Sequence, residues 1–149
     1  QLDGAVIAPS LAEIGGTISD ILHQHSIWVG TLGAEGSQAD MSGVDLSGVS
    51  LRGVELSAVK MERPTLTDVN MAGCSLSMAQ LAGALMNRSN LADSDLRAVN
   101  MKSADLRHAN LEAAVLQKAD LRRADLRGAD LCGAKMTGAD LRGVIGYKD

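Results

Sequence analysis

The chain has 149 residues, a formal net charge of −4 and 46% hydrophobic residues, but only 1% aromatic residues. Because aromatic rings supply much of the burial in most cores, this core must be built from aliphatic side chains. The length suits one domain with a short appendage. The acidic balance argues against direct nucleic-acid binding. No apolar run approaches the ~18 residues of a membrane-spanning helix, so membrane insertion is not expected.

The first 37 residues carry the pattern of a helix. Ser10 to Glu13 fit a capping box, and Pro9 stands just ahead of it. Apolar residues then recur at helical spacing as far as Leu32, and Gly33 is a natural stop. The segment therefore predicts an amphipathic helix over about residues 11–31.

From residue 41 to residue 141 every fifth residue is Leu or Met, in 21 consecutive repeats without an insertion. A small residue, usually Ala or Val, stands two positions earlier, and a short polar residue lies between them. The large residues are predicted to form the core, with these representatives: Met41, Leu46, Leu51, Leu56, Leu76, Leu91, Leu106, Leu121, Leu131 and Leu141.

A period of five fits neither regular secondary structure. On a helix the leucines would drift around the whole cylinder, and on a straight strand they would alternate between faces. A chain that turns a corner once per repeat keeps them all inside. Such a solenoid stacks its coils about 4.8 Å apart, and the frequent Gly two residues after the Leu or Met suits tight corners.

Several repeats resemble the A-(D/N)-L-X-X motif of the pentapeptide-repeat family, among them 104–106, 109–111 and 119–121. The resemblance covers roughly residues 39–143. It implies an all-β solenoid, a right-handed quadrilateral parallel β-helix with four repeats in each 20-residue coil, and hence about five coils. We expect an N-terminal segment (1–37), the β-helix (38–145) and a C-terminal tail (146–149).

The N-terminal helix is expected to cap the first coil, because an open coil exposes unpaired backbone and bare leucines. We assign Ser10, Ile18, Leu22 and Trp28 to this cap, with Trp28 as its anchor. The stretch from His25 to Met41 also resembles a leader that precedes the repeats in some family members. No such cap is predicted at the C-terminal end, which is therefore a candidate surface for self-association.

Some positions depart from the repeat. Pro64 takes a small-residue position, and since it lacks a backbone N–H we expect a ladder hydrogen bond to be lost there. Leu85 and Val115 take the outward polar position, which predicts two apolar side chains near the surface.

Catalytic chemistry has no support in the sequence. His23 and His25 stand two apart on the predicted helix and would face different directions, and His108 is alone on the outer face. Cys74 and Cys132 fit neither a disulfide framework nor a close-spaced zinc pattern, which favours a reducing, cytoplasmic compartment. We therefore predict a protein that is not an enzyme, with no catalytic, cofactor or metal site.

Charge is distributed unevenly along the chain. Residues 1–85 hold 3 basic and 9 acidic groups, whereas residues 86–149 hold 11 and 9. In a 20-residue coil, Lys102, Arg122 and Arg142 would stack on one face, and Arg107 and Arg127 on the next. These columns are either neutralised by Asp across the interior leucines or form a ridge that docks an acidic partner or anionic surface. The candidate partner face consists of Lys102, Arg107, Arg122, Arg127 and Arg142.

Three functions follow from these patterns. The favoured one is a rigid interaction or scaffolding module for a protein partner whose identity the sequence does not give. The resemblance also implies a DNA mimic that binds DNA gyrase, as quinolone-resistance members of the family do, but that role needs a strongly negative rod. The third is a structural subunit of a larger, membrane-associated or multiprotein assembly, docked through the N-terminal helix.

Overall fold

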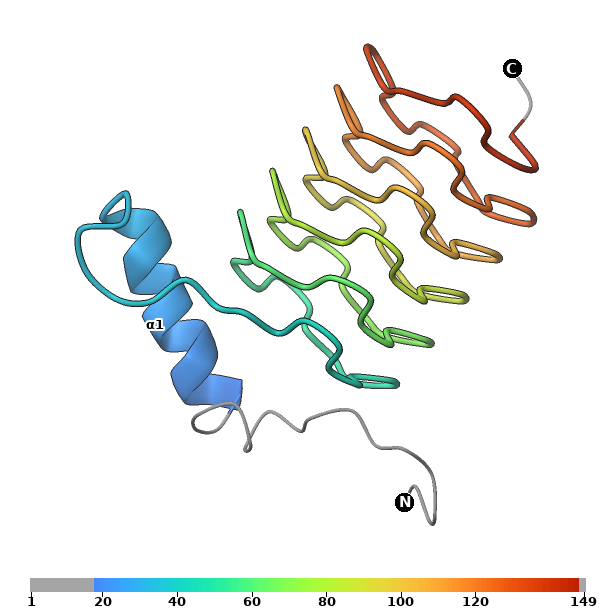
Figure 1. Ribbon diagram of the computed structural model, residues 1–149. Coiled ribbons are helices and arrows are strands. Elements are labelled where there is room, and N and C mark those ends of the chain that lie inside the picture. The colour runs from blue at the N-terminus through green and yellow to red at the C-terminus, as the bar shows by residue number, and fades with distance from the viewer. Residues whose placement is uncertain (1–17, 148–149) are drawn as a thin grey trace.

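The computed structural model describes residues 18–147, and the N-terminal calls on residues 1–17, including Ser10 and the capping box, lie outside the described residues. One helix, α1 (Ile18–Gly30), precedes a stack of coils that carries the chain to its C-terminal end (Figure 1). The helix predicted over residues 11–31 is thus seen over its later part.

The coils are joined by isolated parallel β-bridges rather than by extended strands. Each bridge links a residue to the one 20 positions later, from Asp40 and Lys60 at one end to Asp125 and Ile145 at the other. Residues 18–147 contain no longer strand, because each straight segment is interrupted by a corner within five residues. The 20-residue register agrees with four pentapeptides per coil.

Every pentapeptide turns through a tight corner. The residue two positions after each central Leu or Met has a positive φ, between 50° and 75° at all 21 positions. Many corners are closed by an i→i+3 bond, as where the Val44 N–H donates to the Met41 carbonyl at 3.2 Å. A positive φ confined to the third residue defines a type II turn, which favours Gly. Twelve of these positions nevertheless hold other residues, since ladder bonds on both sides fix the backbone.

The backbone hydrogen bonds divide between corners and ladder, and this division corrects the expectation for Pro64. In a typical repeat the ladder donors are the central residue, the residue two after it and the residue just before it, as in the bond from the Met41 N–H to the Lys60 carbonyl at 2.7 Å. The residue at the position of Pro64 donates only to the corner. Pro64 therefore costs a corner bond, not a ladder bond, and its carbonyl still accepts from the Leu85 N–H at 3.0 Å.

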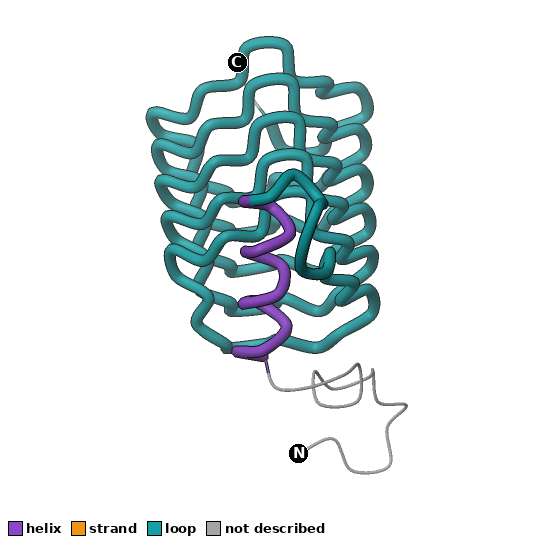
Figure 2. Tube along the Cα trace, turned by 90° about the vertical axis from the view of Figure 1, so that its left-hand side faces the viewer, coloured by secondary structure: helices purple, strands orange, loops and turns teal. Residues whose placement is uncertain are grey.

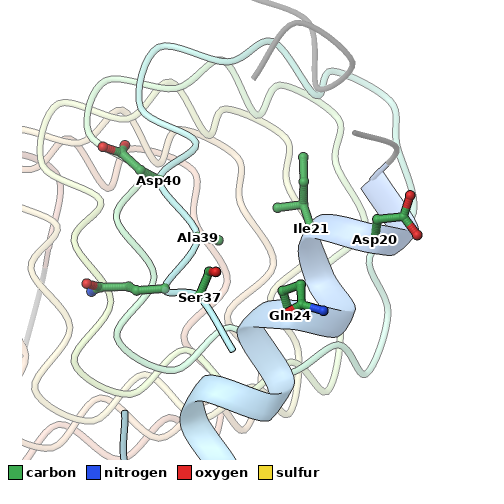
Figure 3. A pocket seen from close by; sticks show the side chains of 7 residues that line it. Asp20, Ile21, Gln24, Ser37, Ala39 and Asp40 are labelled. Carbon is green, nitrogen blue, oxygen red and sulfur yellow. The ribbon is translucent and has the colours of Figure 1, made fainter. Parts of the chain in front are cut away.

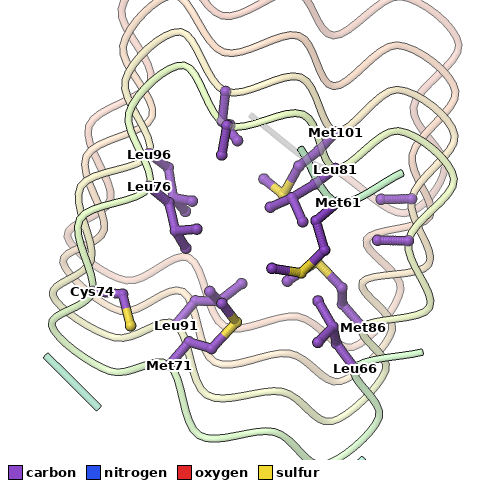
Figure 4. Packing of buried hydrophobic residues seen from close by; sticks show 14 of the residues in the cluster. Met61, Leu66, Met71, Cys74, Leu76, Leu81, Met86, Leu91, Leu96 and Met101 are labelled. Atoms are coloured by element: carbon purple, nitrogen blue, oxygen red, sulfur yellow. The ribbon is translucent and has the colours of Figure 1, made fainter. Parts of the chain in front are cut away.

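The central Leu and Met side chains form a column along the middle of the molecule (Figure 4). From Met41 to Leu126 they are buried, and Ala, Val and Ser side chains fill the spaces between them. The Cys74 thiol, also buried, donates to the Leu51 carbonyl at 2.7 Å. Each buried Leu or Met contributes roughly 1.5–3 kcal/mol, so the column supplies the main driving force for folding.

Helix α1 lies across the N-terminal end of the coil stack, as the view from that end shows (Figure 2). Ile18, Ile21 and Leu22 of this helix pack against the hydrophobic core of the coils. The helix ends in a Schellman motif: the Gly33 N–H donates to the Trp28 carbonyl at 2.8 Å and the Leu32 N–H to the Val29 carbonyl at 3.2 Å. Leu32, with φ 54° and 96% exposure, takes the left-handed position that Gly usually holds.

The C-terminal end of the stack differs from the N-terminal end. Leu131, Met136 and Leu141 are half-buried, although their counterparts in earlier coils are buried. Their backbone N–H groups, which would feed the next coil, have no acceptor among residues 18–147. A hollow of about 390 Å³ lies over this end, lined in part by Leu126, Met136 and Tyr147.

Candidate interaction surface

The junction between α1 and the first coil is organised by His25, which is fully buried. Its Nδ1 accepts a hydrogen bond from the Ala39 N–H at 3.0 Å, and its Nε2 donates to the Ser57 carbonyl at 2.9 Å. The ring also stacks on Trp28, with centroids 5.6 Å apart. Burial lowers the pKa of His25 below its usual value, so the ring is held neutral. Through these two hydrogen bonds, His25 connects α1 to the linker at Ala39 and to the first coil at Ser57.

The linker that returns from α1 to the coils passes close to the helix at Gly36. A Cβ atom at this position would collide with the Gln24 carbonyl oxygen and the Trp28 nitrogen, and φ is +77°. The neighbouring Ser37 N–H donates to the Gln24 carbonyl at 3.1 Å. Only Gly permits this approach, which brings Ala39 to His25.

A hollow of about 260 Å³ lies beside this junction, between α1 and the first coil (Figure 3). Asp20 and Asp40 lie on its two sides, and Ile21, Gln24 and Ser37 line it between them. Within residues 18–147, no group of three or more His, Cys, Asp or Glu side chains is placed to hold a metal ion.

Four arginines of the last coils, Arg107, Arg122, Arg127 and Arg142, each pair with the aspartate two positions earlier in the same repeat. On the side that carries residues 105–108 and 125–128, called here the paired face, Arg107 binds Asp105 at 2.8 Å and Arg127 binds Asp125 at 2.6 Å. In both pairs the guanidinium also bonds through Nε, at 2.9 Å. The hydrogen bonds from Arg127 lower the pKa of Asp125 to about 2.

A second side carries residues 100–103, 120–123 and 140–143 and is called here the basic face. Arg122 binds Asp120 at 2.7 Å and Arg142 binds Asp140 at 2.6 Å. Lys102 lacks such a partner, because Asn100 stands where Asp would be and its Oδ1 accepts the Lys102 backbone N–H, not the ammonium. The five candidate partner residues therefore lie on two faces, as a 20-residue coil predicts.

Arg123 was not among the predicted partner residues. It occupies a corner with φ 62°, the position of Gly in many other repeats, and its side chain joins the basic face. Arg123 stands at the second of the two variable positions of its repeat, where the motif gives no sign of whether a residue binds a partner or only faces solvent. The signal that could have found it is the adjacent pair Arg122–Arg123, which is the only Arg–Arg dipeptide in the chain.

The other predicted residues take varied positions. Ile18, Leu22 and Trp28 are half-buried, as are Leu131 and Leu141, while the remaining eight core representatives are buried. His23 and His108 are exposed, Cys74 is buried and Cys132 is exposed. Leu85 is 46% exposed and Val115 is half-buried. Across residues 18–147, no helix has the length and apolar character needed to cross a bilayer.

Parallel bridges at a fixed register, corners every five residues and an aliphatic column define the chain as a parallel β-solenoid. The family model for pentapeptide repeats matches it in eight copies, over residues 39–77, 65–102, 74–112 and 109–145. The chain belongs to the pentapeptide-repeat family, whose members form right-handed quadrilateral β-helices.

Solved structures similar to the chain have the same fold. QnrB1, a plasmid-mediated fluoroquinolone resistance protein, is 17% identical with a TM-score of 0.60, over 72% of this chain and 59% of QnrB1. A pentapeptide repeat protein from Nostoc PCC 7120 is 21% identical with a TM-score of 0.51, over 88% of this chain and 96% of that protein. Among curated proteins none matches the sequence.

Proposed function

We propose that this protein is a non-enzymatic module of about five coils that binds or scaffolds a protein partner through its flat sides. The observation that carries the proposal is the continuous i to i+20 register, which holds each outer side chain at a fixed place on the ladder. A surface fixed before binding loses little conformational entropy when a partner docks, so affinity does not require a deep cleft.

The proposed partner surface spans both faces: Lys102, Arg122 and Arg142 on the basic face, and Arg107 and Arg127 on the paired face. Arg122 and Arg142 keep 39% and 77% of their side-chain surface exposed while bound to aspartate. Such exposed pairs contribute little to stability, so they are available to reorganise around an acidic partner.

The test is quantitative affinity purification with matched variants. The full chain, the double variant Lys102→Glu/Arg122→Glu and the control Arg52→Glu are used in parallel, and bound proteins are compared by mass spectrometry. A partner retained by the full chain and by Arg52→Glu but lost with the double variant supports the proposal. Equal retention by all three chains contradicts the assigned face.

We propose further that α1 is a cap. Its apolar residues pack on the core and His25 bonds to the first coil. Deleting residues 1–35 should then cause aggregation or loss of cooperative unfolding. A soluble, folded rod that no longer co-purifies with its partner would instead favour the structural-subunit function, with the helix as docking element.

The C-terminal end is a proposed site of self-association, supported by its half-buried leucines and by N–H groups that have no acceptor among residues 18–147. Sedimentation of the full chain should show a species larger than a monomer that disappears with Met136→Lys. Monomer alone at high concentration contradicts this proposal.

The second candidate function is a DNA mimic acting on gyrase, favoured by the fold similarity to QnrB1. It requires a continuous negative surface, and the cations of the basic face interrupt one. Inhibition or protection of gyrase supercoiling at about micromolar protein would place this function ahead of the first.

A further inference from the structure

Four cations of the basic face surround one hollow. Its volume is about 360 Å³, and Lys102, Arg122, Arg123, Arg142 and Gly143 line it. These residues come from three successive coils, because Lys102, Arg122 and Arg142 are 20 positions apart and the ladder stacks them. Adjacent coils lie about 4.8 Å apart, so the three charges lie close together.

The charges around this hollow are only half compensated. Asp120 and Asp140 bind Arg122 and Arg142, and Asp140 also lies 3.8 Å from the Arg122 Nε. Neither Lys102 nor Arg123 has a carboxylate within 4 Å in the described part of the chain. Four cations and two carboxylates leave two positive charges at one place on the surface.

The paired face shows what the same fold does when no charge is left over. Arg107 and Arg127 each have their own aspartate, Asp105 and Asp125. Asp105 is two positions before Arg107, and the equivalent position before Lys102 is held by Asn100. The excess charge of the basic face therefore results from two identifiable residues: Asn100 in place of Asp, and Arg123 in place of Gly.

The donors that remain suit a tetrahedral oxyanion. Arg122 and Arg142 use Nε and Nη2 for their aspartates, so each Nη1 keeps its two N–H donors. The Lys102 ammonium adds three and the Arg123 guanidinium five. A phosphate monoester carries about −1.5 to −2 charge at neutral pH and three acceptor oxygens, whereas a carboxylate has one charge and two oxygens. Two surplus charges and donors on several sides match the phosphate.

We propose that this hollow binds a phosphate group, either free or carried by a phosphorylated segment of a protein partner. The inference deepens the proposed interaction function and rests on it for the phosphoprotein source alone. Because the site is exposed, binding depends on ionic strength, and it weakens as salt screens the cations.

The experiment uses the full chain at low ionic strength and follows backbone amide shifts during titration with inorganic phosphate. We expect saturable shifts at residues 102, 122, 123 and 142. Two variants each remove one of the two surplus charges: Asn100→Asp reproduces the Asp105 arrangement, and Arg123→Gly installs the residue found at the same corner in Gly143. Each should weaken phosphate binding about tenfold. The control Arg97→Ala, which removes an arginine that binds Asp95 at 2.6 Å on another side of the coil, should change it less than about twofold.

Peptide titrations separate the two sources. Tighter binding of a phosphoserine peptide than of inorganic phosphate assigns the site to a phosphorylated partner, and equal binding assigns it to free phosphate. An unphosphorylated glutamate peptide that binds as tightly as the phosphopeptide overturns the proposal, as do unsaturable shifts spread over all arginines. Phosphate binding without capture of any partner would leave this site intact and count against the proposed interaction function alone.

Discussion

The stability of the α1 junction should depend on pH through His25. The pKa of this buried imidazole lies below its ordinary value of 6.5, chiefly because burial disfavours the charged ring; bonding to Ser57 and the charge of Glu55 partly oppose the shift. As pH falls through about 6.5, His25 therefore binds a proton in the unfolded chain before it does so in the folded chain. The contribution of His25 is complete above pH 6.5 and is lost as pH falls from there through the folded pKa.

The size of the effect follows from the two hydrogen bonds. A protonated ring would place an N–H at Nδ1 opposite the Ala39 N–H, which breaks that bond and sets two donors against each other. Each buried hydrogen bond contributes about 1 kcal/mol, and a buried group left unpaired costs about 1–3 kcal/mol more. We expect His25→Phe, which keeps a ring beside Trp28 but removes both bonds, to destabilise the junction by about 2–4 kcal/mol at neutral pH.

The chain has one tryptophan, and it reports on this junction directly. Urea unfolding is followed by Trp28 fluorescence and by circular dichroism of the coils, at about pH 7.5 and 5.5. The wild type should lose junction stability at the lower pH, the exposed-site control His23→Ala should behave like the wild type, and His25→Phe should be nearly independent of pH in this window. Glu55→Gln should move the transition to lower pH. Equal losses in wild type and His25→Phe would refute this reasoning.

Three further predictions concern the coils. Leu106→Ala should cost about 2–5 kcal/mol of unfolding free energy in urea, because the site is fully buried, whereas Leu85→Ala on the surface should cost below about 0.5 kcal/mol. At the corners, Ala113→Gly should raise the unfolding free energy by about 1 kcal/mol and with it the melting temperature, because Ala113 holds a positive φ. Gly48→Ala should lower the unfolding free energy by a similar amount through backbone strain alone, since a Cβ at Gly48 meets nothing within 4 Å. The depressed pKa of Asp125, about 2, predicts stability lost as pH falls below its usual 3.8, and Asp125→Asn should flatten that acid limb in a melting-temperature profile.

The coil fold could be predicted from sequence because the information is local and repeated. Each pentapeptide carries the same choice of large residue inside and polar residue outside, so 21 copies average out individual departures. Pro64 shows the limit of that approach. Its missing N–H was assigned to the ladder, but assigning a donor to corner or ladder requires the hydrogen-bond pattern within the repeat, which periodicity does not contain.

The α1 junction and the basic face depend on contacts between segments that are distant in the sequence, and the sequence pattern does not reveal which of these segments meet. His25 bonds to Ala39 and Ser57, 14 and 32 residues away, and helical spacing says nothing of either. Leu32 holds the left-handed position of the Schellman motif, with φ 54°, although Gly33 is the stronger local stop signal. Arg123 and Lys102 are 21 residues apart in the sequence, and their placement around one hollow can be predicted only when the 20-residue register is known.

Recognition and stability compete at the same corner positions of this fold. A corner favours Gly, and every other residue there carries backbone strain of about 1 kcal/mol. Arg123 bears that strain, with φ 62°, and places beside Lys102 a cation that has no carboxylate within 4 Å among the residues described. Arg123→Gly should therefore melt at a higher temperature than the wild type and bind phosphate more weakly. A binding residue that lowers stability is expected where function, rather than folding, selects the side chain.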